Sequence, residues 1–146
     1  MAILNLKNAR TMYKPKYFKL YELLPPEIYK NEYEGWKLLD ERLLETIDVV
    51  REIIGKPLIC NTWYQGGDRV ASGFRSANCK VGAEMSQHRL GRAADLVCAY
   101  MSASEMRDMI KEHQDKLPYK VRIEDGVTWL HIDIKNRNDV NKIQLF

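Results

Sequence analysis

The chain has 146 residues, of which 45% are apolar and 29% charged, and its formal net charge is +3. These values are ordinary for a folded globular protein and exclude intrinsically disordered, collagen-like and low-complexity sequence. The positive surplus is too small to indicate a nucleic-acid binder, and no apolar run approaches the roughly 20 residues that span a bilayer. We therefore expect a single domain over residues 1–146, a monomer, with neither nucleic-acid nor membrane partners.

Residues 1–35 contain aromatic and proline residues without clear periodicity. The Pro25-Pro26 pair interrupts any continuous helix, so we expect an arm that packs on the core with one short helix at most. The first residues are too few and too polar for a signal peptide, which predicts cytoplasmic synthesis. The three cysteines lack the spacing of a disulfide framework or a zinc ribbon.

Two helices are predicted from the spacing of apolar residues. Between residues 36 and 54 the apolar positions step by three or four, and Gly55 then ends the pattern. The second helix begins at Ser102, because Glu105 three residues later completes a capping box, and it ends before Pro118. Each helix presents one apolar stripe to a core.

Four strands are predicted, over residues 57–64, 92–99, 119–124 and 129–134. The last two alternate apolar and polar side chains, which is typical of half-buried strands, and Asp125-Gly126 between them predicts a hairpin. Because strands and helices occur without repeats or linkers, we predict an α+β fold with a small antiparallel sheet and flanking helices.

Two polar patterns carry the candidate chemistry. In SQHRLGRAAD (residues 86–95), His88 comes just before a predicted strand and Asp95 lies within it. In WLHID (residues 129–133), strand alternation places His131 and Asp133 on the face opposite the aliphatic residues. Two imidazoles and one carboxylate would leave a fourth position for water on a tetrahedral zinc ion, which is the composition of a catalytic site.

A zinc hydrolase also needs a general base, and the hairpin suggests Glu124. A two-residue loop would place Glu124 opposite Val127, and a four-residue loop would place it opposite Trp129. Either register puts Glu124 on the face that carries His131. A three-residue loop would favour Asp125 instead, so Asp125 remains the alternative base.

The patterns S-x-H-x-x-G-x-A-x-D at residues 86–95 and W-x-H-x-D at residues 129–133 resemble the D-alanyl-D-alanine metallopeptidase family. The segment SGFRS at residues 72–76 resembles the Gly-aromatic-Arg-Ser/Thr segment of the same family, and the resemblance covers about residues 57–135. That family includes zinc D-Ala-D-Ala carboxypeptidases, vancomycin-resistance dipeptidases and phage endolysins, and the hedgehog signalling domains share its fold.

The resemblance implies a role for each candidate residue and one Zn²⁺ per chain. The implied zinc ligands are His88, Asp95 and His131, and Glu124 matches the catalytic carboxylate. Arg75 and Ser86 match residues that hold the carbonyl or carboxylate of the substrate, a task that suits the bidentate fork of an arginine. Asp133 is expected to orient His131 from the second coordination shell.

One departure from the family pattern leaves two functions open. Many members place the base three residues before the last histidine, where this chain has Thr128. The resemblance implies a zinc peptidase that hydrolyses peptidoglycan stem or cross-bridge peptides, as a D-Ala-D-Ala carboxypeptidase or an endolysin-like endopeptidase. The alternative is an inactive, zinc-containing cell-wall-binding or phage structural module. A bacteriophage enzyme released to the cell wall at lysis would carry the same sequence features as a cytosolic enzyme.

Overall fold

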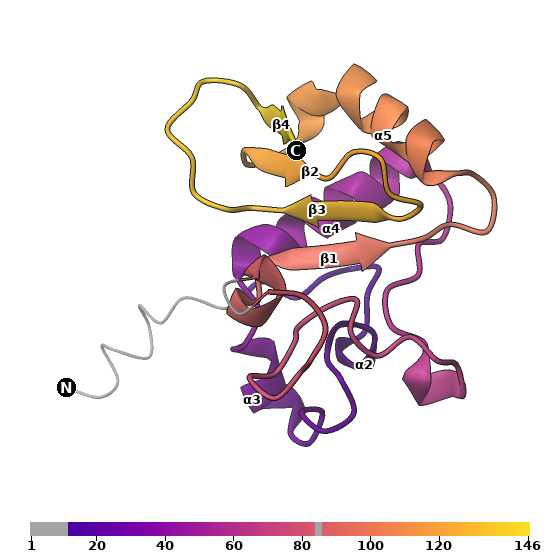
Figure 1. Cartoon of the computed structure of the whole chain (residues 1–146), viewed down its shortest axis with the longest axis vertical. Coiled ribbons are helices and arrows are strands. Elements are labelled where there is room, and N and C mark those ends of the chain that lie inside the picture. Colours follow the sequence, from indigo (N-terminus) through magenta and orange to yellow (C-terminus); the bar gives the residue numbers. More distant parts are fainter. Residues whose placement is uncertain (1–11, 84–85) are drawn as a thin grey trace.

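The computed structural model describes residues 12–83 and 86–146, and it confirms the α+β class. Figure 1 shows helix α4 behind a four-stranded sheet, with α2 and α3 beyond the β1 edge. No helix in the described residues is long and apolar enough to cross a membrane. In chain order the elements are α2 (Leu20–Leu23), α3 (Glu32–Trp36), α4 (Glu41–Ile54), the 3₁₀ helices η1 (Trp63–Gln65) and η2 (Gln87–Leu90), β1 (Ala93–Leu96), α5 (Ala103–Glu112), η3 (Gln114–Lys116), β2 (Val121–Ile123), β3 (Leu130–Asp133) and β4 (Ile143–Leu145).

The sheet is mixed, whereas the sequence predicted an antiparallel one. Its strand order is β1-β3-β2-β4, and the pairs β1–β3 and β3–β2 are antiparallel as expected. Strand β4 pairs with β2 in parallel. This short strand was not predicted, because its three residues lie on the partly exposed edge of the sheet and carry too little pattern to stand out.

The helix predicted over residues 36–54 is two helices. The Asp40 carboxylate accepts a hydrogen bond from the backbone N–H of Arg42 (2.9 Å), so Asp40 is the N-cap of α4 and a new helix begins at Glu41. Trp36 belongs to α3, and it is buried in the same core as α4. The apolar stripe therefore continues across a break in the helix. The described part of the arm, from residue 12 onward, holds two short helices where at most one was expected.

The prediction of a strand over residues 57–64 is also wrong. Only Ile59 forms a bridge, to Val97, and Trp63 already belongs to a 3₁₀ helix. The backbone N–H of Asn61 donates to the carbonyl of Glu22 in the arm (2.9 Å) instead of to a neighbouring strand. Leu58 and Cys60 are buried in the core, and the rings of Trp63 and Tyr64 contact tyrosines of the arm. Sequence periodicity alone does not distinguish such packing from pairing in a sheet.

One face of the sheet packs on the helices and the other face is left for the site. The core-facing residues of the strands include Leu96, Ile123, Leu130 and Ile132, which are all fully buried. They pack with the apolar faces of α4 and α5, and the predicted capping box of α5 forms as Ser102 Oγ accepts from the N–H of Glu105 (3.1 Å). Because side chains alternate along a strand, the polar residues between them share the opposite face.

Candidate metal centre and its cavity

The strand register brings the site residues into one row across the sheet. Asp95 of β1 lies directly opposite His131 of β3. On the other side of β3, the backbone N–H of Glu124 donates to the carbonyl of His131 (3.3 Å). The β2–β3 connection is thus longer than any of the loops considered from the sequence, and its parity is that of the two- and four-residue loops. Glu124 therefore shares a face with His131, as expected.

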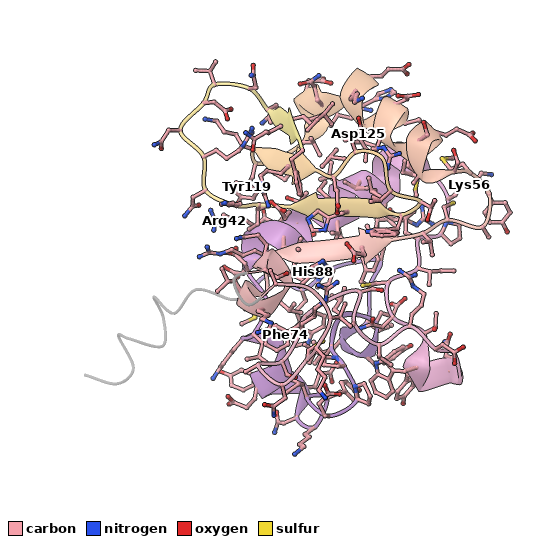
Figure 2. All side chains as sticks on the ribbon, in the orientation of Figure 1. Arg42, Lys56, Phe74, His88, Tyr119 and Asp125 are labelled. Atoms are coloured by element: carbon pink, nitrogen blue, oxygen red, sulfur yellow. The ribbon has the colours of Figure 1, made fainter. Side chains whose placement is uncertain are left out.

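His88 joins this row from the turn before β1. The Ser86 hydroxyl accepts from the backbone N–H of His88 (3.2 Å) and caps the 3₁₀ helix η2, and Gly91 ends that helix with a φ of +69°. Figure 2 labels His88 beside strand β1. One potential ligand atom from each of His88, Asp95 and His131 lies within 4.8 Å of the other two, and all three residues are buried.

Each histidine presents a defined ring nitrogen to the cluster. The Nδ1 of His88 lies 2.8 Å from the carbonyl oxygen of Gly73, so Nδ1 donates the hydrogen and Nε2 is left facing the Asp95 carboxylate (3.2 Å). For His131 the order is reversed: Nε2 pairs with Asp133 (2.8 Å) and Nδ1 faces Asp95 (2.9 Å). The cluster thus offers two ring nitrogens and one carboxylate oxygen, and these fit a tetrahedral zinc ion with one open position. Each histidine is also held by an acceptor at its other ring nitrogen, as is usual for histidines that bind metals.

The ionisation of the cluster shows how strongly this site favours positive charge. Burial alone would lower the pKa of His131, but hydrogen bonds to Asp133 and Asp95 outweigh it and raise the pKa to about 9. Burial alone would raise the pKa of Asp95, but hydrogen bonds from His131 and His88 hold that pKa well below its usual range. Without a metal, a proton on His131 therefore offsets the negative charge of the Asp95 and Asp133 carboxylates, which a bound cation would otherwise help to neutralise.

Asp133 is fully buried and is the centre of a hydrogen-bond network behind His131. Its carboxylate accepts from Arg122 Nε (2.9 Å) and Nη2 (2.8 Å), and from the backbone N–H of Lys135 (3.2 Å), in addition to His131. This placement agrees with the orienting role expected for Asp133. Sequence reasoning missed Arg122, although its alternation with buried Val121 and Ile123 was a visible signal.

Arg75 and Ser86 line the same cavity as the metal cluster. Arg75 is buried, donates from Nε to the carbonyl of Ala71 (2.7 Å), and pairs through Nη2 with the second oxygen of Asp95 (3.3 Å). A Cβ atom on Gly82 would lie 2.5 Å from Arg75 Nη1, so a side chain at position 82 would displace the end of the guanidinium. Arg75 thus holds Asp95 as well as facing the cavity, and Ser86 both faces the cavity and caps η2.

The cavity has a volume of about 510 Å³, and its lining distinguishes between the two candidate bases. Glu124 lines it, together with Trp129, Lys135 and Phe146, whereas Asp125 does not. Arg107 of α5 accounts for this difference: it is buried, donates to the carbonyls of Val127 (3.1 Å) and Trp129 (3.3 Å), and lies 3.6 Å from the Asp125 carboxylate. Figure 2 labels Asp125 on the side of α5, away from His88.

Comparison with known proteins gives one match. No curated protein matches this chain, and no solved structure does. The sequence model of the Peptidase M15 family matches residues 22–133, which is more than half of the chain and contains every residue of the metal cluster. This chain therefore belongs to the Peptidase M15 family of zinc metallopeptidases.

Proposed function

We propose that this protein hydrolyses peptide bonds in the stem or cross-bridge peptides of peptidoglycan, with a zinc ion held by His88, Asp95 and His131. The observation that carries the proposal is the row Asp95–His131–Glu124, which places the Glu124 carboxylate beside the candidate ligands within one cavity. Bound zinc supplies Lewis-acid chemistry, because it acidifies a water molecule and polarises a carbonyl group.

The residues of the chain supply the proton transfers and hold the substrate. Glu124 accepts a proton from the attacking water and returns it to the nitrogen of the leaving amine. The Arg75 guanidinium donates to the carbonyl oxygen, where negative charge develops during the attack. Asp133 and Gly73 fix the ring orientation of His131 and His88, so the cluster needs little rearrangement when it binds a cation.

The shape of the site favours cleavage within a chain over removal of a terminal residue. A second cavity of about 330 Å³ adjoins the first and shares four lining residues with it: Arg75, Val81, Asp95 and Trp129. The second cavity extends away from the metal cluster toward residues 68–72. A substrate chain can therefore pass Asp95 in both directions, which supports an endopeptidase.

Mass spectrometry of digested peptidoglycan tests the proposal. Cross-linked peptidoglycan and soluble stem pentapeptide are incubated with zinc-loaded protein, with chelated protein, and with the matched variants Glu124→Gln and Asp125→Asn. We expect a zinc-dependent product cut at an internal bond, lost in Glu124→Gln and retained in Asp125→Asn. Release of only the terminal D-Ala would establish a carboxypeptidase and refute the endopeptidase assignment. Stoichiometric zinc and tight muropeptide binding without any turnover would favour the inactive binding module.

A further inference from the structure

Among the residues that the structure describes, the cavity is lined by one cation that is not paired with an acidic side chain of the protein. Of the described residues that line it, three are arginine or lysine, namely Arg75, Arg122 and Lys135. The guanidinium of Arg75 pairs with Asp95, and that of Arg122 pairs with Asp133. Lys135 is exposed, and within the described part of the chain no acidic side chain or carbonyl is bonded to its ammonium group.

Lys135 lies two residues beyond the end of β3 and continues the alternation of side chains along that strand. Trp129, His131, Asp133 and Lys135 are spaced by two residues and all line the cavity, so they form a line along one face. The backbone N–H of Lys135 is anchored on the buried Asp133 carboxylate (3.2 Å), which fixes where the lysine leaves the strand. Lys135 follows His131 by four positions, which corresponds to roughly 13 Å at the strand spacing of about 3.3 Å per residue.

We propose that Lys135 is a specificity-determining residue that binds a carboxylate of the substrate away from the scissile bond. This inference rests on the proposed function, because it takes the substrate to be a peptide lying along the cavity. A peptide in extended conformation covers the 13 Å with about four residues, and the reach of the lysine side chain shortens this to two or three. The carboxylate that Lys135 recognises therefore belongs to a residue a few positions from the bond that is cut.

A stem peptide of the composition L-Ala-γ-D-Glu-L-Lys-D-Ala-D-Ala, in which D-Glu is joined to L-Lys through its γ-carboxyl group, offers two such groups: the α-carboxylate of D-Glu and the terminal carboxylate. The probes are this peptide, its form with D-isoglutamine, and its form with a C-terminal amide. Calorimetry measures the dissociation constant of each with the zinc-loaded Glu124→Gln protein, which does not depend on turnover. The same measurement is made with double variants that combine Glu124→Gln with Lys135→Gln or Lys135→Arg. A third double variant, with Lys30→Gln, is the control, because it removes one exposed charge elsewhere.

We expect Lys135→Gln to weaken binding of the unmodified peptide by about two- to five-fold, which is the range for an exposed ion pair. Amidation of the carboxylate that Lys135 binds should weaken binding to the protein with Lys135 by the same factor, and it should not change binding to the Lys135→Gln variant. The peptide that shows this pattern identifies the carboxylate that Lys135 binds. Lys135→Arg should retain most of the affinity and Lys30→Gln all of it. In protein with Glu124 intact, Lys135→Gln should raise KM and leave kcat within two-fold.

Equal affinity of the Lys135 and Lys135→Gln proteins for all three peptides would overturn the inference. An equal loss of affinity for all three would also overturn it, because a purely structural effect does not distinguish a carboxylate from an amide. Absence of turnover in the zinc-loaded wild type is a separate result: it refutes the proposed function, and the calorimetric comparison still decides the role of Lys135.

Discussion

Replacing Arg122 with alanine tests the network behind the metal cluster most directly. Arg122 makes two charge-assisted hydrogen bonds to Asp133, which is fully buried, and its own side chain is 18% exposed. Removing one partner of a buried ion pair costs about 3–5 kcal/mol. Asp133 would keep its bonds from His131 and from the backbone of Lys135, so we expect a loss of about 2–3 kcal/mol in the free energy of unfolding.

Urea denaturation of chelator-treated protein measures this loss, and it corresponds to a fall of about 4–12 °C in Tm for a chain of this size. Because Asp133 orients His131, zinc affinity measured against a competing chelator should also fall by about 10- to 100-fold. Arg122→Lys should restore part of both, since lysine returns the charge but not the two-pronged geometry.

The matched control is Lys37→Ala, which removes a pair with Glu34 whose two side chains are 47% and 65% exposed. That change should cost no more than about 0.5 kcal/mol. A loss below about 1 kcal/mol in Arg122→Ala, together with unchanged zinc affinity, would refute the view that Arg122 supports the site through Asp133.

Three further predictions concern the metal, the turn and a helix cap. Zinc at about 1,000 times its Kd should stabilise the wild type by about 4 kcal/mol, and differential scanning fluorimetry should show no such shift in His88→Ala. Gly91→Ala should lose at least about 2 kcal/mol in urea, because its φ is +69° and its Cβ would lie 2.0 Å from the Leu38 carbonyl oxygen; Gly126→Ala, with φ +75° but open space, should lose only about 1 kcal/mol. Burial alone would raise the pKa of Asp40, but hydrogen bonds from its neighbouring arginine lower it, so its charge stabilises the fold above about pH 4 and ceases to do so as the pH falls. The wild type should therefore be more stable than Asp40→Asn at pH 7 by about 0.5–1 kcal/mol, and this difference in unfolding free energy should disappear near pH 2; a difference that persists at pH 2 would contradict the assignment.

Alternation along the strands was the most informative feature of the sequence. It placed His131 and Asp133 on one face, and it placed Glu124 on that face whichever even-numbered hairpin loop was assumed. The loop proved longer than expected, yet the face was unchanged, because lengthening a hairpin loop by two residues preserves the parity of the pairing. The same rule extended by one step would have found Lys135 and Arg122.

Other parts of the site carry no local signal. The carbonyl of Gly73 holds His88 from 15 residues away, and any residue type has a backbone carbonyl. Arg107 fixes the β2–β3 loop through backbone carbonyls about 20 residues further along, and from sequence it reads as an ordinary polar residue on the second helix. Phe146, which lines the cavity, directly follows β4, a strand set by pairing in the folded state rather than by its own pattern. These contacts depend on tertiary packing, which periodicity does not encode.

The row of site residues across the sheet also determines when the site can form during folding. His88 and Asp95 are seven residues apart and can approach each other early, but His131 meets Asp95 only when strands 36 residues apart have paired. Contacts of such long sequence separation form after the loop-closure entropy of the intervening chain has been overcome. Until those strands have paired, the chain therefore brings together at most two of the three candidate ligands. Competence to bind zinc tightly, and with it the capacity to cut peptides, arises only as the sheet closes around β3.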